Sequence, residues 1–240
     1  MLPRSTPLEP SDRPTVRPSD TQITAIQPSP RQPGRFTIIV GERPIATLSL
    51  DAIERLGLAV GTSVAAREEA IDAEAAQLAV YDRALNMLAA RARSSAELAR
   101  LLVRKGEPKV LVDRAIARLT EHGLLDDAAF AQSFTRSRVL GAQQSRRRVQ
   151  RDLQRKGVPR DVSAAAITTV LEEEDVDQRA VVEQAARKKL RSLVKLDPAV
   201  RRRRLYAFLA RRGYELDDIR RAMDAVGEAL AGREMEEGEM

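Results

Sequence analysis

A threefold internal repeat constrains the fold of this chain more than any other feature of its sequence. When the chain is aligned on Lys105-Gly106, Lys156-Gly157 and Arg212-Gly213, apolar residues coincide at five positions in all three copies. The matched sets are Leu98, Val149 and Leu205; Leu102, Leu153 and Leu209; Ala115, Ala166 and Ala222; Ile116, Ile167 and Met223; and Leu119, Val170 and Val226. Apolar spacings of three and four residues are typical of helices that bury one face. The repeat therefore predicts stacked copies of one helical unit.

Each copy is predicted to contain three helices. A basic residue followed by glycine marks the end of the middle helix, and we expect the glycine to adopt a left-handed conformation. Ser94 with Glu97 forms a capping-box pattern, Ser145 and Asp126 are placed to cap their own helices, and proline falls in the first turn of the third helix in two copies, at Pro108 and Pro159. A further helix precedes each pair, over 78–91, 128–140 and 181–193.

The predicted fold class is mainly all-α, because such units cannot cover their apolar stripes alone and must stack into an elongated array. We place the three-helix repeats at residues 70–127, 128–177 and 178–228, followed by an acidic tail over 229–240.

The segment before the repeats differs from them in composition and in its apolar pattern. Eight of the twelve prolines lie within the first 33 residues, and residues 1–21 have no apolar periodicity, which predicts a disordered N-terminal tail. Residues 23–26, 35–40 and 45–48 predict strands, Ser49 is placed to cap a helix over 50–56, and residues 58–64 predict a further strand. We therefore expect a small α+β module over residues 22–66, preceding the helical array.

The composition excludes several classes of function. The chain has no cysteine and one histidine, which removes thiolate nucleophiles and the usual zinc sites, and Gly57 to Ser63 lacks the lysine of a phosphate loop. We therefore expect no catalytic residues, no metal and no cofactor. The chain has no apolar run long enough for a membrane span and no apolar core of a secretory signal at its N-terminus, so a cytoplasmic location without membrane association is expected.

The basic charge lies in one segment. Residues 81–227 carry +12 of formal charge, whereas the whole chain carries +6. On the predicted middle helix of the second copy, Arg147, Arg148, Arg151 and Arg155 lie opposite the apolar Val149 and Leu153. The candidate binding residues across the copies are Arg100, Arg104, Lys105, Arg146, Arg147, Arg148, Arg151, Arg155, Lys156, Arg201, Arg202, Arg204, Arg211 and Arg212. A single charge run is typical of a solvated face, but its recurrence in three copies favours an anionic or acidic partner.

Two other clusters have alternative interpretations. Tyr206 and Tyr214 lie near the third basic cluster and are placed either to stack on bases or to pack in the core. The acidic run from Glu172 to Asp175 is interpreted as a solvated linker, because adjacent side chains on a helix do not converge on an ion.

An ordered set of motifs resembles the RecX regulatory family. The set comprises Ala84-Leu85-Asn86-Met87-Leu88 through Arg91, Arg93-Ser94-Ser95-Ala96-Glu97-Leu98, Leu124-Leu125-Asp126-Asp127-Ala128-Ala129-Phe130-Ala131, Asp152-Leu153-Gln154-Arg155-Lys156-Gly157-Val158 and Phe208-Leu209-Ala210-Arg211-Arg212-Gly213-Tyr214. The resemblance covers roughly residues 81–226. It departs from the family before the second basic helix, where a glycine pair is common and Gln143 and Ser145 stand here, with Gly141 nearby.

The resemblance implies a monomeric bacterial regulator of DNA repair, homologous recombination and the SOS response. Family members bind the RecA filament on single-stranded DNA and inhibit its ATP hydrolysis, strand exchange and co-protease activity. The alternative from the residues alone is an autonomous helical-repeat protein that contacts DNA phosphates through its basic surface. The two hypotheses differ in whether binding to bare DNA persists at physiological salt.

Overall fold

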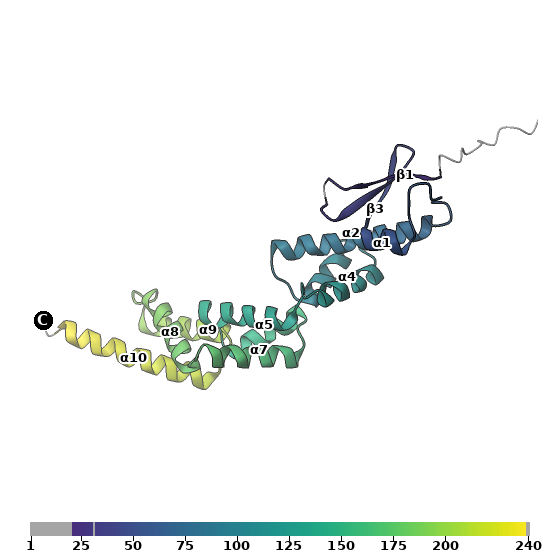
Figure 1. Ribbon diagram of the computed structural model, residues 1–240. Coiled ribbons are helices and arrows are strands. Elements are labelled where there is room, and N and C mark those ends of the chain that lie inside the picture. The colour runs from purple at the N-terminus through teal and green to yellow at the C-terminus, as the bar shows by residue number, and fades with distance from the viewer. Residues whose placement is uncertain (1–20, 31, 239–240) are drawn as a thin grey trace, which may run out of the picture. The chain divides into compact units, whose positions relative to one another are not determined.

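The computed structural model describes residues 21–30 and 32–238, so the predicted disordered tail lies, apart from Thr21, outside the described residues. The chain divides within a long helix into two compact units, Met1–Arg83 and Ala84–Met240. Figure 1 shows strands in the first unit and helices throughout the second. The predicted class, helical repeats preceded by a small α+β module, is confirmed.

The first unit contains a three-stranded antiparallel sheet. Its strands β1 (Ile23–Pro28), β2 (Arg35–Val40) and β3 (Arg43–Ser49) lie in the order β1-β2-β3. They are followed by α1 (Leu50–Arg55), whose N-cap Ser49 accepts a hydrogen bond from the Ala52 amide, and by the start of α2 (Glu68–Ala90). The core of this unit consists of Ile23, Ile38, Leu48, Ala52, Ile53, Leu58 and Ile71.

The strand predicted over residues 58–64 is wrong. Gly57 and Gly61 both have positive φ, at 60° and 88°, so the chain turns there instead of extending. The segment joins the sheet region through an isolated bridge between Gln22 and Ser63 and through the Gly61 amide, which donates to the Ile23 carbonyl at 2.8 Å.

The second unit consists of three successive three-helix repeats. The first contains the end of α2, α3 (Ser95–Arg104) and α4 (Lys109–Glu121). The second contains α5 (Asp127–Arg136), a π-helical turn η2 (Ser137–Gly141), α6 (Arg146–Lys156) and α7 (Arg160–Glu173). The third contains α8 (Gln178–Arg191), α9 (Pro198–Arg211) and α10 (Leu216–Gly238).

Several predicted boundaries shift. The helix expected over 128–140 ends its α-helical part at Arg136 and continues as the π-helical turn. The last helix, α10, extends to Gly238 and so includes most of the segment predicted as an acidic tail. Pro108 and Pro159, expected in the first turns of their helices, occupy the N-cap positions one residue earlier.

The repeated apolar positions form the core of the helical unit. At four of the five aligned positions the residues are buried in all three copies, including Leu102, Leu153 and Leu209, each with 0% exposure. At the remaining position Ile167 is buried, whereas Ile116 and Met223 are half-buried. The internal repeat therefore reports the residues that pack between the helices.

Equivalent capping serines join the second repeat to the first and the third to the second, with acceptors that differ by one residue in the repeat alignment. Ser94 caps α3 and its hydroxyl also donates to the Lys156 carbonyl at 2.6 Å. Ser145 caps α6 and donates to the Gly213 carbonyl at 2.7 Å. Both serines stand twelve residues before the glycine of their own repeat. Each of these serines therefore starts a helix in its own repeat and binds the turn of the next.

The repeat glycines adopt the expected left-handed conformation, with φ of 92° at Gly106, 88° at Gly157 and 87° at Gly213. Two of them also permit close approach. A Cβ on Gly157 would lie 2.3 Å from the Cβ of Ala96, and a Cβ on Gly213 would lie 2.6 Å from that of Arg148. A Cβ on Gly106, the glycine of the first repeat, would meet nothing within 4 Å.

Candidate recognition surface

The basic side chains of α6 divide into exposed and half-buried groups. Arg147, Arg151 and Arg155 are exposed, as expected from their position opposite Val149 and Leu153. Arg148, expected to point into solvent, is half-buried because its Cβ packs beside Gly213 of the third repeat. The solvent-facing part of this helix is therefore narrower than the sequence suggests.

Carboxylates neutralise part of the α6 charge. Asp152 pairs with Arg148 at 3.1 Å and also with Arg155, and Arg147 pairs with Glu215 of the third repeat at 3.4 Å. Among the described residues, Arg151 has no carboxylate partner. The Arg147–Glu215 pair is exposed on both sides and exchanges readily with another anion, since the free energy of such a pair is only about 0–1 kcal/mol.

Lys156 has a structural role at the junction of the first two repeats. Its ammonium group pairs with Glu97 at 2.9 Å and lies 5.8 Å and 5.7 Å from the ring centroids of Phe130 and Phe134. Arg100, on α3, donates to the Lys156 carbonyl at 2.9 Å. Both cations are therefore engaged in holding the two repeats together.

Glu97 is the carboxylate at the centre of this junction. The capping box expected with Ser94 is formed only in part, since the Glu97 amide donates to Ser94 while its carboxylate binds Arg91, Arg93 and Lys156. Burial alone would raise the pKa of the Glu97 carboxyl, but the hydrogen bond and charge of Lys156, with the charges of the two arginines, outweigh it. The pKa of Glu97 consequently lies below its ordinary value.

The junction of the second and third repeats contains Arg212 and Tyr214. Arg212 donates to the Gln143 carbonyl at 3.1 Å and lies 4.5 Å from the centroid of Phe208. The Tyr214 hydroxyl donates to the same carbonyl at 2.9 Å, and burial raises its pKa to about 12, against a lowering effect of Arg212. Tyr214 is thus a junction residue, whereas Tyr206 is 43% exposed.

The remaining predicted binding residues lie on two other helices and at the start of α6. Arg104 and Lys105 are exposed at the end of α3, and Arg146 is exposed at the start of α6. On α9, Arg202, Arg204 and Arg211 are exposed and Arg201 is half-buried. Arg100 donates to the backbone carbonyls of Arg155 and Lys156, which brings these three residues together. Within the described ranges no hydrogen bond or ion pair joins Arg201, Arg202 or Arg204 to the α6 group.

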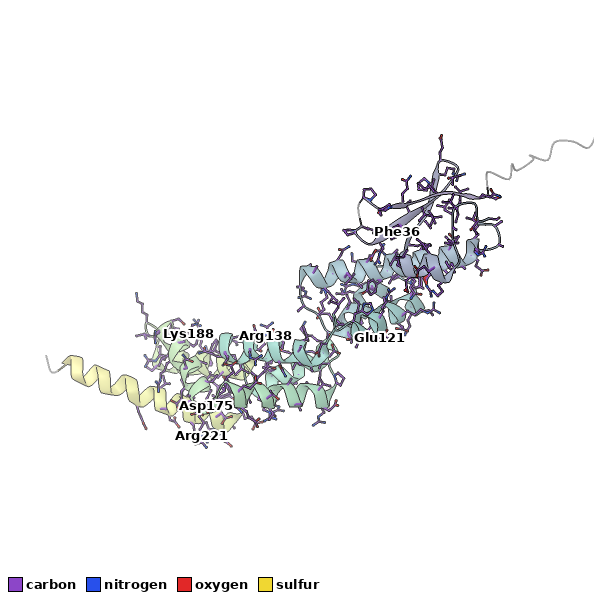
Figure 2. All side chains as sticks on the ribbon, viewed as in Figure 1. Phe36, Glu121, Arg138, Asp175, Lys188 and Arg221 are labelled. Atoms are coloured by element: carbon purple, nitrogen blue, oxygen red, sulfur yellow. The ribbon has the colours of Figure 1, made fainter. Side chains whose placement is uncertain are left out.

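A pocket of about 530 Å³ lies at the junction of the second and third repeats. Its lining includes three of the predicted features, Arg146, Arg147 and Tyr214, together with residues that the sequence reasoning missed. The missed residues are Gln150, Gln178, Arg179, Glu215, Asp218 and Arg221, the last labelled in Figure 2. The first turns of α8 and α10 carry no basic run, so only an alignment of the junctions would have found them.

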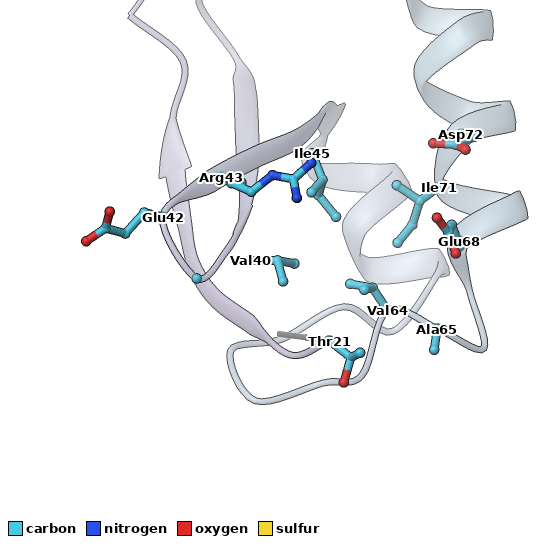
Figure 3. Close-up of a pocket in the computed structure, with 11 residues that line it drawn as sticks. Thr21, Val40, Glu42, Arg43, Ile45, Val64, Ala65, Glu68, Ile71 and Asp72 are labelled. Carbon is cyan, nitrogen blue, oxygen red and sulfur yellow. The ribbon is translucent and has the colours of Figure 1, made fainter. Parts of the chain in front are cut away.

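The first unit contains a pocket of another character. It has a volume of about 700 Å³ and lies between the β2–β3 turn and the start of α2 (Figure 3). Val40, Ile45 and Ile71 form an apolar part, and Glu42, Glu68 and Asp72 contribute carboxylates beside Arg43. Its charge is opposite to that of the basic α6 surface.

Two further expectations concern metal and membrane. Within residues 21–30 and 32–238 no cluster of histidine, aspartate and glutamate is placed to bind a metal ion. In the acidic run, Glu173 and Glu174 instead bind Arg136 of α5, Glu174 at 2.8 Å. None of the described helices is both long and apolar enough to span a bilayer.

Three linked three-helix units with a basic face define a tandem helical-repeat protein. The chain matches family models described as the first, second and third three-helix domains of RecX, over residues 81–119, 126–167 and 177–223. This chain belongs to the RecX family of regulatory proteins.

Relatives agree with this assignment, and solved structures agree with the fold. The regulatory protein RecX of Mycobacterium marinum is 44% identical over 131 residues, which cover 54% of this chain and 74% of the relative. The regulatory protein RecX of Chlorobaculum tepidum is 35% identical over 153 residues, covering 64% of this chain and 91% of the relative. A crystal structure of a regulatory protein RecX aligns with a TM-score of 0.68 and 20% identity over 85% of this chain and 99% of that one. RecX from Lactobacillus salivarius aligns with a TM-score of 0.52 and 17% identity over 63% and 97% of the two chains.

Proposed function

We propose that this chain binds the RecA filament on single-stranded DNA and restrains its growth, and so inhibits ATP hydrolysis, strand exchange and co-protease activity. It acts as a cytoplasmic, monomeric binding protein without catalytic turnover, metal or cofactor. Membership of the RecX family supports a regulatory role. The single structural observation that carries the proposal is the exposed basic face of α6, where Arg151 has no carboxylate partner among the described residues.

The repeat arrangement supports a multivalent mode of binding. Three linked units offer contacts to several neighbouring protomers of a filament, and linked weak contacts gain affinity through effective concentration. We therefore expect inhibition at substoichiometric amounts. Removal of the third repeat, from Asp177 onward, is expected to weaken inhibition by much more than one third.

The test is steady-state ATP hydrolysis by the RecA of the same organism on single-stranded DNA, measured against added protein. The variant Arg151→Glu with Arg155→Glu reverses two exposed charges of the basic face and should inhibit less at low salt. Arg191→Glu, an exposed arginine at the end of α8, provides a control outside this face. Equal inhibition by the parent and the double variant would reject the role of α6, and no effect of the parent would reject the proposed function.

A direct contact with DNA phosphates is the second candidate function, favoured by the same uncompensated charge. Binding to bare single-stranded DNA through about four phosphates predicts that log affinity falls with log salt at a slope near −3. Binding that persists at physiological salt without RecA would favour this candidate. Binding that requires RecA on the strand would favour the filament.

A further inference from the structure

The two junctions of the helical unit are built on the same plan but differ in charge. Aligned on the repeat glycines, Ser95, Ala96 and Ala99 of α3 correspond to Arg146, Arg147 and Gln150 of α6. Aligned on the helix caps Asp126 and Asp177, the first two residues of the following repeat, Asp127 and Ala128, correspond to Gln178 and Arg179. Small and acidic residues at the first junction are thus replaced by basic and amide residues at the second.

At the first junction a carboxylate of the chain occupies the space between the two repeats. The backbone N–H of Ser95, the first residue of α3, donates to Oδ1 of Asp127 at 2.8 Å. Asp127 is the first residue of α5, so this bond joins the starts of two helices from adjacent repeats. It also satisfies one of the free amides at the N-terminus of α3.

At the second junction the corresponding space is the 530 Å³ pocket, a volume within the usual range of ligand sites, about 300–1,000 Å³. Gln178 replaces the carboxylate of Asp127, and the backbone N–H of Arg146, which corresponds to that of Ser95, has no acceptor in the described part of the chain. The amide that Asp127 satisfies at the first junction is therefore open here.

The charges around this pocket are unbalanced. Its lining contains four arginines against two acidic residues, a formal charge of +2. Glu215 pairs with Arg147 at 3.4 Å and Asp218 pairs with Arg221 at 2.7 Å. The other two guanidinium groups have no carboxylate partner within the described ranges. Arg146 donates to the Thr168 hydroxyl at 3.1 Å, and the side chain of Arg179 forms no hydrogen bond or ion pair with the described residues.

We propose that this pocket binds a phosphate group, with the guanidinium groups of Arg146 and Arg179 and the backbone N–H of Arg146 as donors. The bound anion takes the place that the Asp127 carboxylate occupies at the first junction. Phosphate fits better than a carboxylate because two arginine forks and an amide from two helices offer more donors than two oxygen atoms accept. The group comes either from the backbone of single-stranded DNA or from free phosphate.

Anion binding here has a structural consequence. Arg146 and Arg147 lie on α6 of the second repeat, whereas Arg179 lies on α8 of the third. One anion therefore links the two repeats, and its binding free energy adds to the stability of the junction. The inference concerns a binding site of the chain itself and holds whether or not the chain inhibits RecA.

The experiment compares the intact protein with variants that restore the residues of the first junction. Gln178→Asp places a carboxylate where Asp127 stands, and Arg146→Ser with Arg179→Ala removes both free cations. Arg191→Ser, an exposed arginine at the other end of α8 and outside both the pocket and the basic face of α6, is the matched control. Thermal unfolding is measured in inorganic phosphate and in chloride at equal ionic strength, and affinity is measured by anisotropy of a fluorescent oligothymidylate.

We expect phosphate to raise the Tm of the parent and of Arg191→Ser but not that of the pocket variants. Without phosphate, Gln178→Asp should be at least as stable as the parent. The double variant should bind the oligonucleotide about tenfold more weakly than the parent, and Arg191→Ser less than about threefold more weakly. If the pocket variants lose only the binding of the oligonucleotide, the site exists and its ligand is the DNA backbone. If they lose only the effect of inorganic phosphate, the site exists and its ligand is the free ion. The proposal is overturned if neither probe distinguishes the pocket variants from Arg191→Ser. Loss of phosphate binding with full inhibition of RecA would separate this site from the proposed function.

Discussion

Replacement of Gly157 by alanine tests how much the junction between the first two repeats contributes to stability. With φ at 88°, the left-handed conformation costs about 1–2 kcal/mol for any residue with a Cβ. The new Cβ would also lie 2.3 Å from the Cβ of Ala96, where contact distances are about 3.5–4.0 Å. Because Ala96 has no rotamer that moves its Cβ away, α3 must shift, and overpacking of this kind costs about 1–3 kcal/mol. The total expected loss is about 2–5 kcal/mol.

Gly106→Ala provides the matched control, since its φ is 92° and its Cβ would meet nothing within 4 Å. The gain from a less flexible unfolded chain is common to both variants and cancels in the comparison. The free energy of unfolding, measured by thermal unfolding, should therefore be about 1–3 kcal/mol lower for Gly157→Ala than for Gly106→Ala, which is roughly 2–12 °C in Tm. Adding Ala96→Gly to Gly157→Ala should recover most of this difference. Equal Tm values for the two single variants would refute the close contact between the repeats.

Three further predictions concern the junction residues. Ser94→Ala should lower the free energy of unfolding by about 1–3 kcal/mol, because it removes a helix cap and leaves the Lys156 carbonyl without this donor; urea unfolding beside Ser95→Ala, expected within about 0.5 kcal/mol of the parent, checks this. Tyr214→Phe should reduce the alkaline sensitivity of the fold. The pKa of Tyr214 is about 12 in the folded state against 10.0 in the unfolded state, so the parent loses stability as pH rises from 10 through 12. Identical stability profiles of parent and variant from pH 9 to 12 would contradict this prediction. Glu97→Gln should be less stable than the parent at neutral pH. The difference in stability should vanish as pH falls below the ordinary carboxyl pKa of 4.5 and through the lowered pKa of Glu97, because both chains are then neutral at this position. Chemical unfolding of both proteins at pH 7 and pH 3 measures this difference.

The helical repeats could be predicted from the sequence because each apolar position occurs three times. Leu102, Leu153 and Leu209 are fully buried, and the glycine turns have the expected sign of φ. A single copy of any of these motifs would have been ambiguous. Agreement among three copies removes accidental matches, since only positions with a common structural role coincide.

The exposure of individual cations could not be predicted in the same way. Lys156 and Arg148 occur in basic runs like those of solvated residues, yet they are half-buried because the adjacent repeat packs on them. The helical period places a side chain on a face of its own helix but does not specify what covers that face. For the same reason the pocket between the second and third repeats, which requires Arg179 and Arg146 from different helices, was not found from the basic run alone.

The serine that links each repeat to the next is absent from the third copy. The position twelve residues before Gly213 is Arg201, which lies within α9 and whose amide donates to the Asp197 carbonyl at 2.8 Å. The third repeat therefore lacks the capping hydroxyl that would bind a following turn, while a Cβ on Gly106 of the first repeat would meet nothing within 4 Å in the described part of the chain. The two ends of the series do not complement each other, so one molecule cannot add to the next by the contact that joins repeats within it. Head-to-tail growth into open-ended fibres, the usual hazard of a repeated contact, therefore has no serine donor at the third repeat.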